Sequence, residues 1–258
     1  ITHPNITLDG AGHTITGLGT VTGQPKAIMI SNQMHEITIK NLTIKNFNTG
    51  IEANNINGLT ITGVTIENVG SYAVYLYGAD GLTFESNNIS GFVNIVGHNA
   101  YWGQGNGSCT GNGQYVSSSQ DGPMVIKSNT ITGNGLSVEG SGYCIDGNTI
   151  SGASNGIYIA ATSFNGGATP TSHTISNNVI TGSQTGIKVV SNADGNTITS
   201  NTIKDGLEGI GCSGSDNNTI SGNTITNNKP SNFGLSGTSQ AMAIGTCSNK
   251  TISNNQIT

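Results

Sequence analysis

The amino-acid sequence predicts an all-β fold, a solenoid of parallel strands that winds through about ten coils and forms three sheets. A short unit, apolar–x–x–Asn–x–Ile, recurs along the 258-residue chain at intervals of about 22 residues. Apolar and polar residues alternate within each unit, which is the pattern of short strands with one buried face. No segment carries a sustained helical period, so we expect almost no helix.

The first repeated element is the unit that contains the Asn. Complete copies start at Phe84, Ile126, Ile145, Ile175, Ile198, Ile220 and Ile252. Degenerate copies start at Ile39 and Ile61, with Leu42 and Val64 in place of the Asn. We expect the Asn side chains to point inward at the turn between two strands, where stacked amides satisfy one another from coil to coil.

The next repeated element is a strand introduced by Gly, which lies between successive units. It begins at Gly50, Gly135, Gly156, Gly186 and Gly209. Each coil therefore has three strands. We call the sheet of Gly-led strands the first sheet, the strands before the repeated Asn the second sheet, and the strands after it the third sheet.

These units, together with the opening segment Asn5-Ile-Thr-Leu-Asp-Gly-Ala-Gly-His-Thr-Ile-Thr-Gly17, resemble the right-handed parallel β-helix repeat family, the pectate-lyase-like superfamily. The resemblance covers nearly all of the chain and implies one domain, residues 1–258. It implies an architecture and leaves the activity open, because this fold hosts lyases, hydrolases, epimerases, phage spikes and adhesins. It also implies that enzymes of this fold bind glycan chains along the first sheet.

Composition excludes several classes of partner. Charged residues make up 8% of the chain, the net charge is −5, and no Arg is present. Nucleic acid is therefore an unsuitable partner, because phosphate binding needs clustered cations. No apolar run is long enough for a transmembrane helix, so we expect no membrane insertion. The chain begins at Ile1 without Met, which indicates a processed or excised segment.

Four cysteines fall into two pairs, each separated by 35 residues. In the register of the repeat the members of each pair are one coil apart, so we predict the disulfides Cys109–Cys144 and Cys212–Cys247. A free, buried Cys212 is the alternative. Disulfides indicate a secreted or cell-surface protein. Glycosylation sequons agree with that setting and lie at Asn5, Asn41, Asn88, Asn106, Asn217 and Asn249.

Three insertions break the period, at residues 98–122, 162–172 and 228–240, all next to the first sheet. Insertions along one edge of a solenoid usually build its binding face. The first outward row of this sheet is predicted to hold Glu52, Tyr75, Asn94, Ser137, Tyr158, Lys188, Gly211 and Ala243. The second row is predicted to hold Asn54, Tyr77, Val96, Glu139, Ala160, Val190, Ser213 and Gly245.

A polysaccharide lyase or epimerase needs a base and an acid on the sugar ring. Tyr158, Lys188 and Glu139 fall on successive coils, and they are the candidate catalytic residues. A glycosidase pair is excluded, because Glu52 and Glu139 are about three coils apart at roughly 4.8 Å per coil. Exposed Lys residues are ordinarily only solvated, so the trio competes with a non-catalytic interpretation.

Aromatic and polar side chains of the same face are candidates for glycan binding. Aromatic rings can stack on sugar rings, although loop packing and strand propensity explain them equally well. The candidate residues are Glu52, Tyr75, Tyr77, Asn94, His98, Tyr101 and Trp102.

We predict no metal centre and no cofactor, with Ca²⁺ as the alternative. Asp80, Asp194 and Asp216 share one position at the start of the second-sheet strands, where an Asp before Gly or Asn more often caps a turn than binds Ca²⁺. The histidines form no spaced cluster, and we expect them in turns and at the surface; they are His3, His13, His35, His98 and His173.

Outward Thr rows on the second and third sheets resemble the faces of ice-binding solenoids. The second-sheet row contains Thr38, Thr60, Thr83, Thr174, Thr197, Thr219 and Thr251. The third-sheet row contains Thr43, Thr65, Thr130, Thr149, Thr202 and Thr224. Charged residues interrupt both rows, and Thr is in any case a favoured strand residue.

Three functions therefore remain open. The absence of an end cap and the low charge favour an extracellular structural or adhesive protein, a filament subunit whose copies stack head to tail. The alternative is a polysaccharide lyase or epimerase, or a glycan-binding protein, that uses the first sheet. Ice binding is a minor alternative. Which glycan, which organism and which oligomeric state apply are not readable from the sequence.

Overall fold

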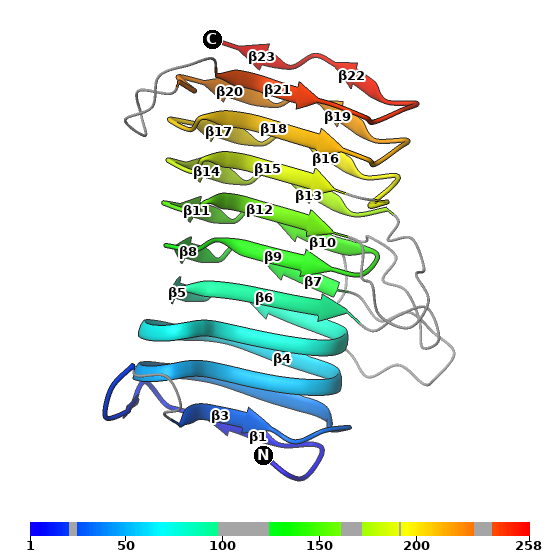
Figure 1. Ribbon diagram of the computed structural model, residues 1–258. Helices are drawn as coiled ribbons and strands as arrows, with labels where there is room; N and C mark the ends of the chain where they lie inside the picture. The colour runs from blue at the N-terminus through cyan, green and yellow to red at the C-terminus, as the bar shows by residue number, and fades with distance from the viewer. Residues whose placement is uncertain (21–24, 98–123, 161–171, 191, 230–238) are drawn as a thin grey trace.

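The computed structural model describes residues 1–20, 25–97, 124–160, 172–190, 192–229 and 239–258. These residues form a parallel β-helix with strands stacked coil upon coil from the N-terminus to the C-terminus (Figure 1). The strand pairings of the described residues are all parallel, and no helix occurs among these residues. The predicted all-β solenoid with three sheets is confirmed. The predicted insertions lie almost wholly outside the described residues.

Strand β4 (His35–Glu85) runs without interruption through the second, third and fourth coils, and it contributes to all three sheets. The other first-sheet strands are β3 (Lys26–Ile30), β6 (Phe92–Gly97), β9 (Leu136–Glu139), β12 (Asn155–Ala160), β15 (Thr185–Val190), β18 (Glu208–Ser213) and β21 (Gln240–Ile244). The other second-sheet strands are β1 (Thr7–Asp9), β7 (Met124–Lys127), β10 (Tyr143–Asp146), β13 (Thr174–Ser176), β16 (Thr197–Thr199), β19 (Thr219–Ser221) and β22 (Thr251–Ser253). The other third-sheet strands are β2 (Thr14–Thr16), β5 (Asn88–Ser90), β8 (Thr130–Thr132), β11 (Thr149–Ser151), β14 (Val179–Thr181), β17 (Thr202–Lys204), β20 (Thr224–Thr226) and β23 (Gln256–Ile257).

The closing Ile of each unit lies above that of the previous coil. Ile89 pairs with Ile131, Ile131 with Ile150, and Ile150 with Ile180. All four side chains are fully buried. Burying an aliphatic side chain of this size contributes about 1.5–3 kcal/mol relative to leaving it exposed. This stack of Ile side chains is the centre of the core.

The predicted amide ladder lies at the corner between the second and third sheets. In each step of the ladder, one Asn donates its side-chain amide to the side-chain oxygen of the Asn on the next coil, at 2.9–3.0 Å. The same oxygen also accepts the backbone N–H of the preceding Asn. The ladder consists of Asn87, Asn129, Asn148, Asn178, Asn201, Asn223 and Asn255.

The Gly residues that begin the first-sheet strands are explained by close contact between coils. A Cβ atom added at Gly186 would lie 2.6 Å from the Gly209 carbonyl oxygen and 2.4 Å from Ile203 Cγ2. Gly50, Gly156 and Gly209 meet the same two kinds of obstacle. Their backbone torsions are not in the left-handed region. Glycine is therefore required here for space rather than for an unusual torsion.

A second ladder, which the sequence analysis did not predict, lies at the corner where the chain enters the second sheet. Asn196 donates its side-chain amide to Asn218 over 2.8 Å, and its own side-chain oxygen accepts the His173 backbone N–H at 3.2 Å. His173 occupies the same position one coil earlier, where its Nδ1 accepts the Tyr143 backbone N–H at 3.1 Å. His173 is completely buried, so its expected place at the surface was wrong.

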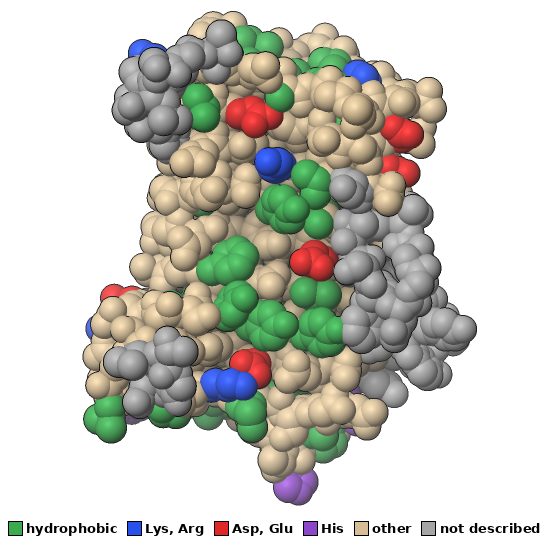
Figure 2. Space-filling view, viewed as in Figure 1, with side chains coloured by type: hydrophobic (Ala, Val, Ile, Leu, Met, Phe, Trp, Pro, Cys, Tyr) green, Lys and Arg blue, Asp and Glu red, His purple; other side chains and the backbone are tan. Residues whose placement is uncertain are grey.

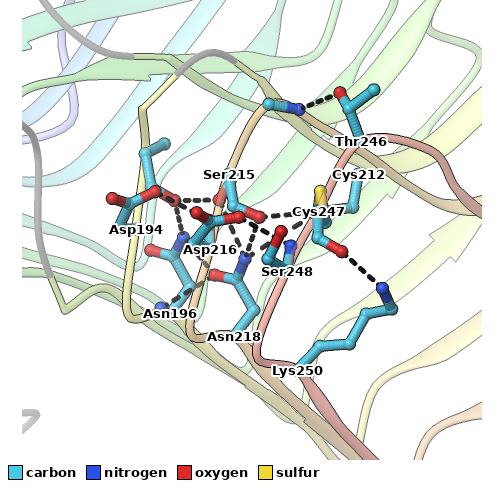
Figure 3. The surroundings of a disulfide bond; sticks show 12 residues. Asp194, Asn196, Cys212, Ser215, Asp216, Asn218, Thr246, Cys247, Ser248 and Lys250 are labelled. Atoms are coloured by element: carbon cyan, nitrogen blue, oxygen red, sulfur yellow. Dashed lines mark hydrogen bonds between the residues drawn. A yellow bond between two sulfur atoms is a disulfide. The ribbon is translucent and has the colours of Figure 1, made fainter.

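The Cys212–Cys247 disulfide is confirmed and joins adjacent coils, with the Cα atoms 6.2 Å apart. Figure 3 shows it beside Ser215 and Asn218, whose side chains are hydrogen-bonded to each other at 2.8 Å. Cys144 is also disulfide-bonded. Its predicted partner, Cys109, lies outside the described residues.

The second-sheet Thr row is discontinuous. Thr174, Thr197, Thr219 and Thr251 stack in register, but Val125 and Cys144 occupy the same row on earlier coils and are buried. Thr83, which was expected to face outward, is also buried. On the third sheet, Asn88, Val179 and Gln256 interrupt the Thr row. Ice binding stays a prediction.

Among the described residues, no helix has the length and hydropathy needed to cross a membrane.

Candidate functional site

The outward face of the first sheet carries the candidate site, and its predicted register is confirmed. Tyr75 pairs with Asn94, Asn94 with Ser137, Ser137 with Tyr158, and Tyr158 with Lys188. These residues form one column that runs parallel to the axis of the β-helix. Because coils are stacked about 4.8 Å apart, the column provides a regular series of side chains along one line.

Hydrophobic side chains gather in the middle of this face (Figure 2). The Tyr72 ring lies 4.9 Å from the Tyr75 ring and 5.6 Å from the Phe92 ring, the latter nearly parallel. Such separations are those of favourable aromatic contacts. All three side chains are partly exposed, so their outer faces are free to contact a ligand. Burial, together with neighbouring phenols and carboxylates, raises the pKa of Tyr75.

An open groove of about 400 Å³ adjoins the aromatic patch. Its walls come from three successive coils, β6, β9 and β12, together with the turns that precede β9 and β12. Two aromatic residues line it, Phe92 and Tyr158, with Leu136 between them. The remaining lining is polar and uncharged, and comprises Asn134, Ser137, Ser154 and Asn155. A volume of this size is within the range of ligand sites in proteins.

The three candidate catalytic residues lie on successive coils as predicted, but they do not share the groove. Tyr158 lines the groove, whereas neither Glu139 nor Lys188 does. Glu139 pairs with Ala160 and so lies diagonally from Tyr158, one row across and one coil earlier. Burial raises the pKa of the Glu139 carboxyl group. Lys188 is one coil beyond Tyr158, on the far side from the other lining residues.

Lys188 differs from several other lysines in its electrostatic environment. Lys40, Lys45 and Lys127 each form an ion pair with an acid on an adjacent coil. Lys26 forms an ion pair with Glu52. Glu52, a candidate glycan-binding residue, is therefore part of an ion pair at the edge of the face. The register neighbours of Lys188 are Tyr158 and Gly211, and it has no ion pair within the described residues.

Glu208 is a charged residue of this face that the sequence analysis missed. Its carboxylate accepts a hydrogen bond from Thr185 at 3.1 Å and lies over Gly211, where an added Cβ would be 2.5 Å from Oε1. The sequence signal for Glu208 was present, because a Gly in an outward row leaves room for a neighbouring side chain.

Other residues of this face were missed because they lie before the regular alternation of inward and outward residues begins in their strands. They are Tyr72, Phe92, Asn134 and Asn155.

The other predicted glycan-binding residues have different outcomes. Tyr77 and Asn94 lie on this face, next to the aromatic patch. The Asn94 side-chain oxygen is buried and has no hydrogen-bond partner within the described residues. His98, Tyr101 and Trp102 lie outside the described residues.

Two of the Asp residues considered for Ca²⁺ accept backbone hydrogen bonds from the next coil. Asp194 accepts the Asp216 N–H at 2.7 Å, and Asp216 accepts the Ser248 N–H at 2.6 Å, so each carboxylate caps the next coil (Figure 3). Asp80 is buried at the equivalent position several coils earlier. No group of three or more metal-ligating side chains occurs in the parts of the chain that the structure describes.

Comparisons with known proteins agree with this architecture. The model of the family described as right handed beta helix region matches residues 5–166 and 164–258. No curated protein sequence is a significant match. Among solved structures, the chain is similar to the A-module of the mannuronan C-5 epimerase AlgE6 of Azotobacter vinelandii, with 13% identity and a TM-score of 0.30. That likeness covers 99% of this chain and 89% of the other, and it is too remote to carry an inference about activity.

Proposed function

Because the chain belongs to the right-handed β-helix family, we propose that it is a secreted carbohydrate-binding protein whose first sheet holds a glycan chain. The observation that carries this proposal is the groove of about 400 Å³ between Phe92 and Tyr158, next to the Tyr72–Tyr75 ring pair. Aromatic rings bury a large apolar area and present flat faces. Such faces suit the apolar C–H faces of sugar rings.

The repeat of the fold supports a linear ligand. The aromatic patch and the groove together extend over successive coils, from Tyr75 in β4 to Tyr158 in β12. The two rings occupy the first and the fourth of four consecutive positions in one column. Three coil spacings of roughly 4.8 Å therefore separate them, about 14 Å in all. A ligand that contacts both rings must therefore be longer than one sugar unit.

Binding is better supported than catalysis. A lyase or epimerase needs an acid and a base that reach the same sugar ring. Only Tyr158 of the three candidate residues lines the groove. Catalysis by Tyr158, Lys188 and Glu139 therefore stays a prediction. The filament role also stays a prediction, because nothing in the described residues supports it.

The cysteine chemistry supports the secreted part of the proposal. The Cys212–Cys247 bond and the disulfide-bonded Cys144 agree with an oxidising compartment, since disulfides rarely persist in the cytosol.

The proposal is tested by measuring glycan affinity with isothermal titration calorimetry after a glycan-array screen. We expect the Tyr75→Ala and Phe92→Ala substitutions each to weaken binding by about tenfold, the equivalent of one lost ring contact of about 1.4 kcal/mol. The matched control is Val179→Ala, because Val179 is exposed on the third sheet. Absence of any glycan ligand, or equal affinity of the ring variants and the control, would contradict the proposal.

A further inference from the structure

We propose that the groove selects an uncharged glycan and rejects polyuronates. This inference rests on the proposed function, since it names the substrate class of the same site. It also departs from the chemistry expected if the protein were a uronate lyase or epimerase, because such enzymes act on sugars that carry carboxylates.

The first step of the argument is the composition of the groove. Its described lining contains no carboxylate, ammonium or imidazole group. A carboxylate that leaves water without a cationic partner or sufficient hydrogen-bond donors costs several kcal/mol in free energy. A polyuronate carries a carboxylate on every sugar, so each carboxylate that the groove removes from water would meet this cost.

The second step is the hydrogen-bonding capacity of the lining. The side-chain amides of Asn134 and Asn155 each offer donors and an acceptor, and the hydroxyl groups of Ser137, Ser154 and Tyr158 can donate or accept. Sugar hydroxyl groups also donate and accept. The groove is therefore matched to neutral hydroxyl groups rather than to an anion, which accepts only.

The third step concerns the nearest charges. Lys188 lies one coil beyond Tyr158, so a single ammonium group is available at one end of the groove and none within it. Glu139 adds a carboxyl group diagonally from Tyr158, and Glu208 adds another beyond Lys188. With a net charge of −5 and no Arg in the chain, long-range electrostatics also oppose a polyanion.

The test compares matched hexasaccharides by calorimetry on the full chain. The neutral probes are β-1,4-linked glucan, mannan and xylan hexamers, and the acidic probes are galacturonate and mannuronate hexamers. We expect at least one neutral hexamer to bind at least about tenfold more tightly than either acidic hexamer, which corresponds to a difference of about 1.4 kcal/mol. Raising the salt concentration should not weaken neutral binding, because no ion pair is formed.

Two variants of Asn155 test whether neutral glycans bind in the groove. Asn155→Asp places a carboxylate in the groove, and Asn155→Thr introduces the residue found at the same register position on the next coil, Thr185. We expect both to weaken neutral binding by about fivefold to tenfold, the loss of one or two hydrogen bonds. Thermal unfolding of each variant checks that the coil is intact, and Val179→Ala again serves as the control.

The outcomes distinguish this inference from the proposed function. Binding of an acidic hexamer that is lost in Lys188→Ala, without binding of any neutral hexamer, would overturn the inference and leave the glycan-binding function in place. Binding of neither class in the screen and the titrations would overturn both. Preferential binding of a neutral hexamer that depends on Asn155 supports both.

Discussion

The side-chain amide of Asn148 donates a hydrogen bond to the side-chain oxygen of Asn178 on the next coil, at 3.0 Å. The same oxygen accepts the Asn148 backbone N–H at 2.9 Å. Asn148 also donates to the Ile126 carbonyl, at 2.9 Å, and both Asn side chains are completely buried. The Asn side chains therefore link three successive coils and satisfy backbone groups of two of them at a buried corner.

We predict that Asn148→Ala lowers the free energy of unfolding by about 2–4 kcal/mol. The substitution leaves the Asn129 N–H buried without its acceptor and removes one hydrogen bond from the Ile126 carbonyl; a buried group left unsatisfied costs about 1–3 kcal/mol and a lost hydrogen bond about 1 kcal/mol. Urea denaturation measures the change. Asn88→Thr is the control: Asn88 is exposed and its register neighbour is Thr130. A loss in Asn148→Ala no larger than in the control would contradict the ladder's role.

His173 should make stability depend on pH. Burial lowers its pKa from 6.5 to about 4, which the nearby Gly140 backbone opposes only in part. Nε2 has no hydrogen-bond partner of good geometry within the described residues. Between pH 4 and 6.5 the unfolded chain binds a proton at this site that the folded chain does not, so stability falls as the pH falls through this range. The free energy of unfolding falls by up to about 3 kcal/mol over the whole range.

The measurement is the free energy of unfolding at pH 7 and at pH 4.5. His173→Asn is the informative variant, because Asn occupies this ladder position on the next coil, at Asn196. We expect this variant to fold and to lose less stability between the two pH values than the unsubstituted chain does. An identical pH dependence in both proteins would show that His173 is not responsible.

Gly186→Ala should destabilise the fold by about 1–3 kcal/mol, the usual cost of overpacking a core. The added methyl group would meet the Gly209 carbonyl oxygen and Ile203, and both belong to the closely packed core. Gly245→Ala is the matched control, since its Cβ would meet only the Cys212 carbonyl oxygen at an ordinary 3.4 Å. Thermal unfolding of the two variants should separate them clearly, and equal melting temperatures would contradict the steric explanation.

Removing the Cys212–Cys247 disulfide by a double substitution to Ser should cost about 2–4 kcal/mol. The bond closes a loop with a sequence separation of 35 residues, and such a constraint reduces the entropy of the unfolded chain. Calorimetric unfolding under oxidising conditions gives the difference. Reducing agent should lower the melting temperature of the unsubstituted chain more than that of the variant, and the reverse order would count against this account.

Much of the fold could be predicted from the sequence because the solenoid is built from local repeats. The stacking of Ile89, Ile131, Ile150 and Ile180 determines the register, and the register then assigns the outward column of the first sheet from Tyr75 to Lys188. The repeated Asn and Gly have local reasons, namely an amide that satisfies a buried turn and a lack of room for a Cβ atom. These relationships recur in most coils, so the pattern is visible without the structure.

The candidate site was predictable only in part. Tyr75, Asn94 and Tyr158 followed from alternation along the strands, whereas Phe92, Asn134 and Asn155 lie where a turn meets a strand and the alternation does not apply. The position of Glu208 over Gly211 depended on space left by another residue. His173 directly precedes Thr174 as Asn196 precedes Thr197, so the register aligned the two positions, but the burial of this position was not recognised.

The sequence by itself thus determined the solenoid, its three sheets and the inward Asn ladder, because each depends on interactions that repeat from one coil to the next. It also determined one disulfide, because the repeat places Cys212 and Cys247 one coil apart. Only the tertiary structure decided which side chains share the groove, that Lys188 and Glu139 lie outside it, and that His173 is buried. Those properties depend on distances between side chains of different coils and on water exclusion, which no repeat period encodes.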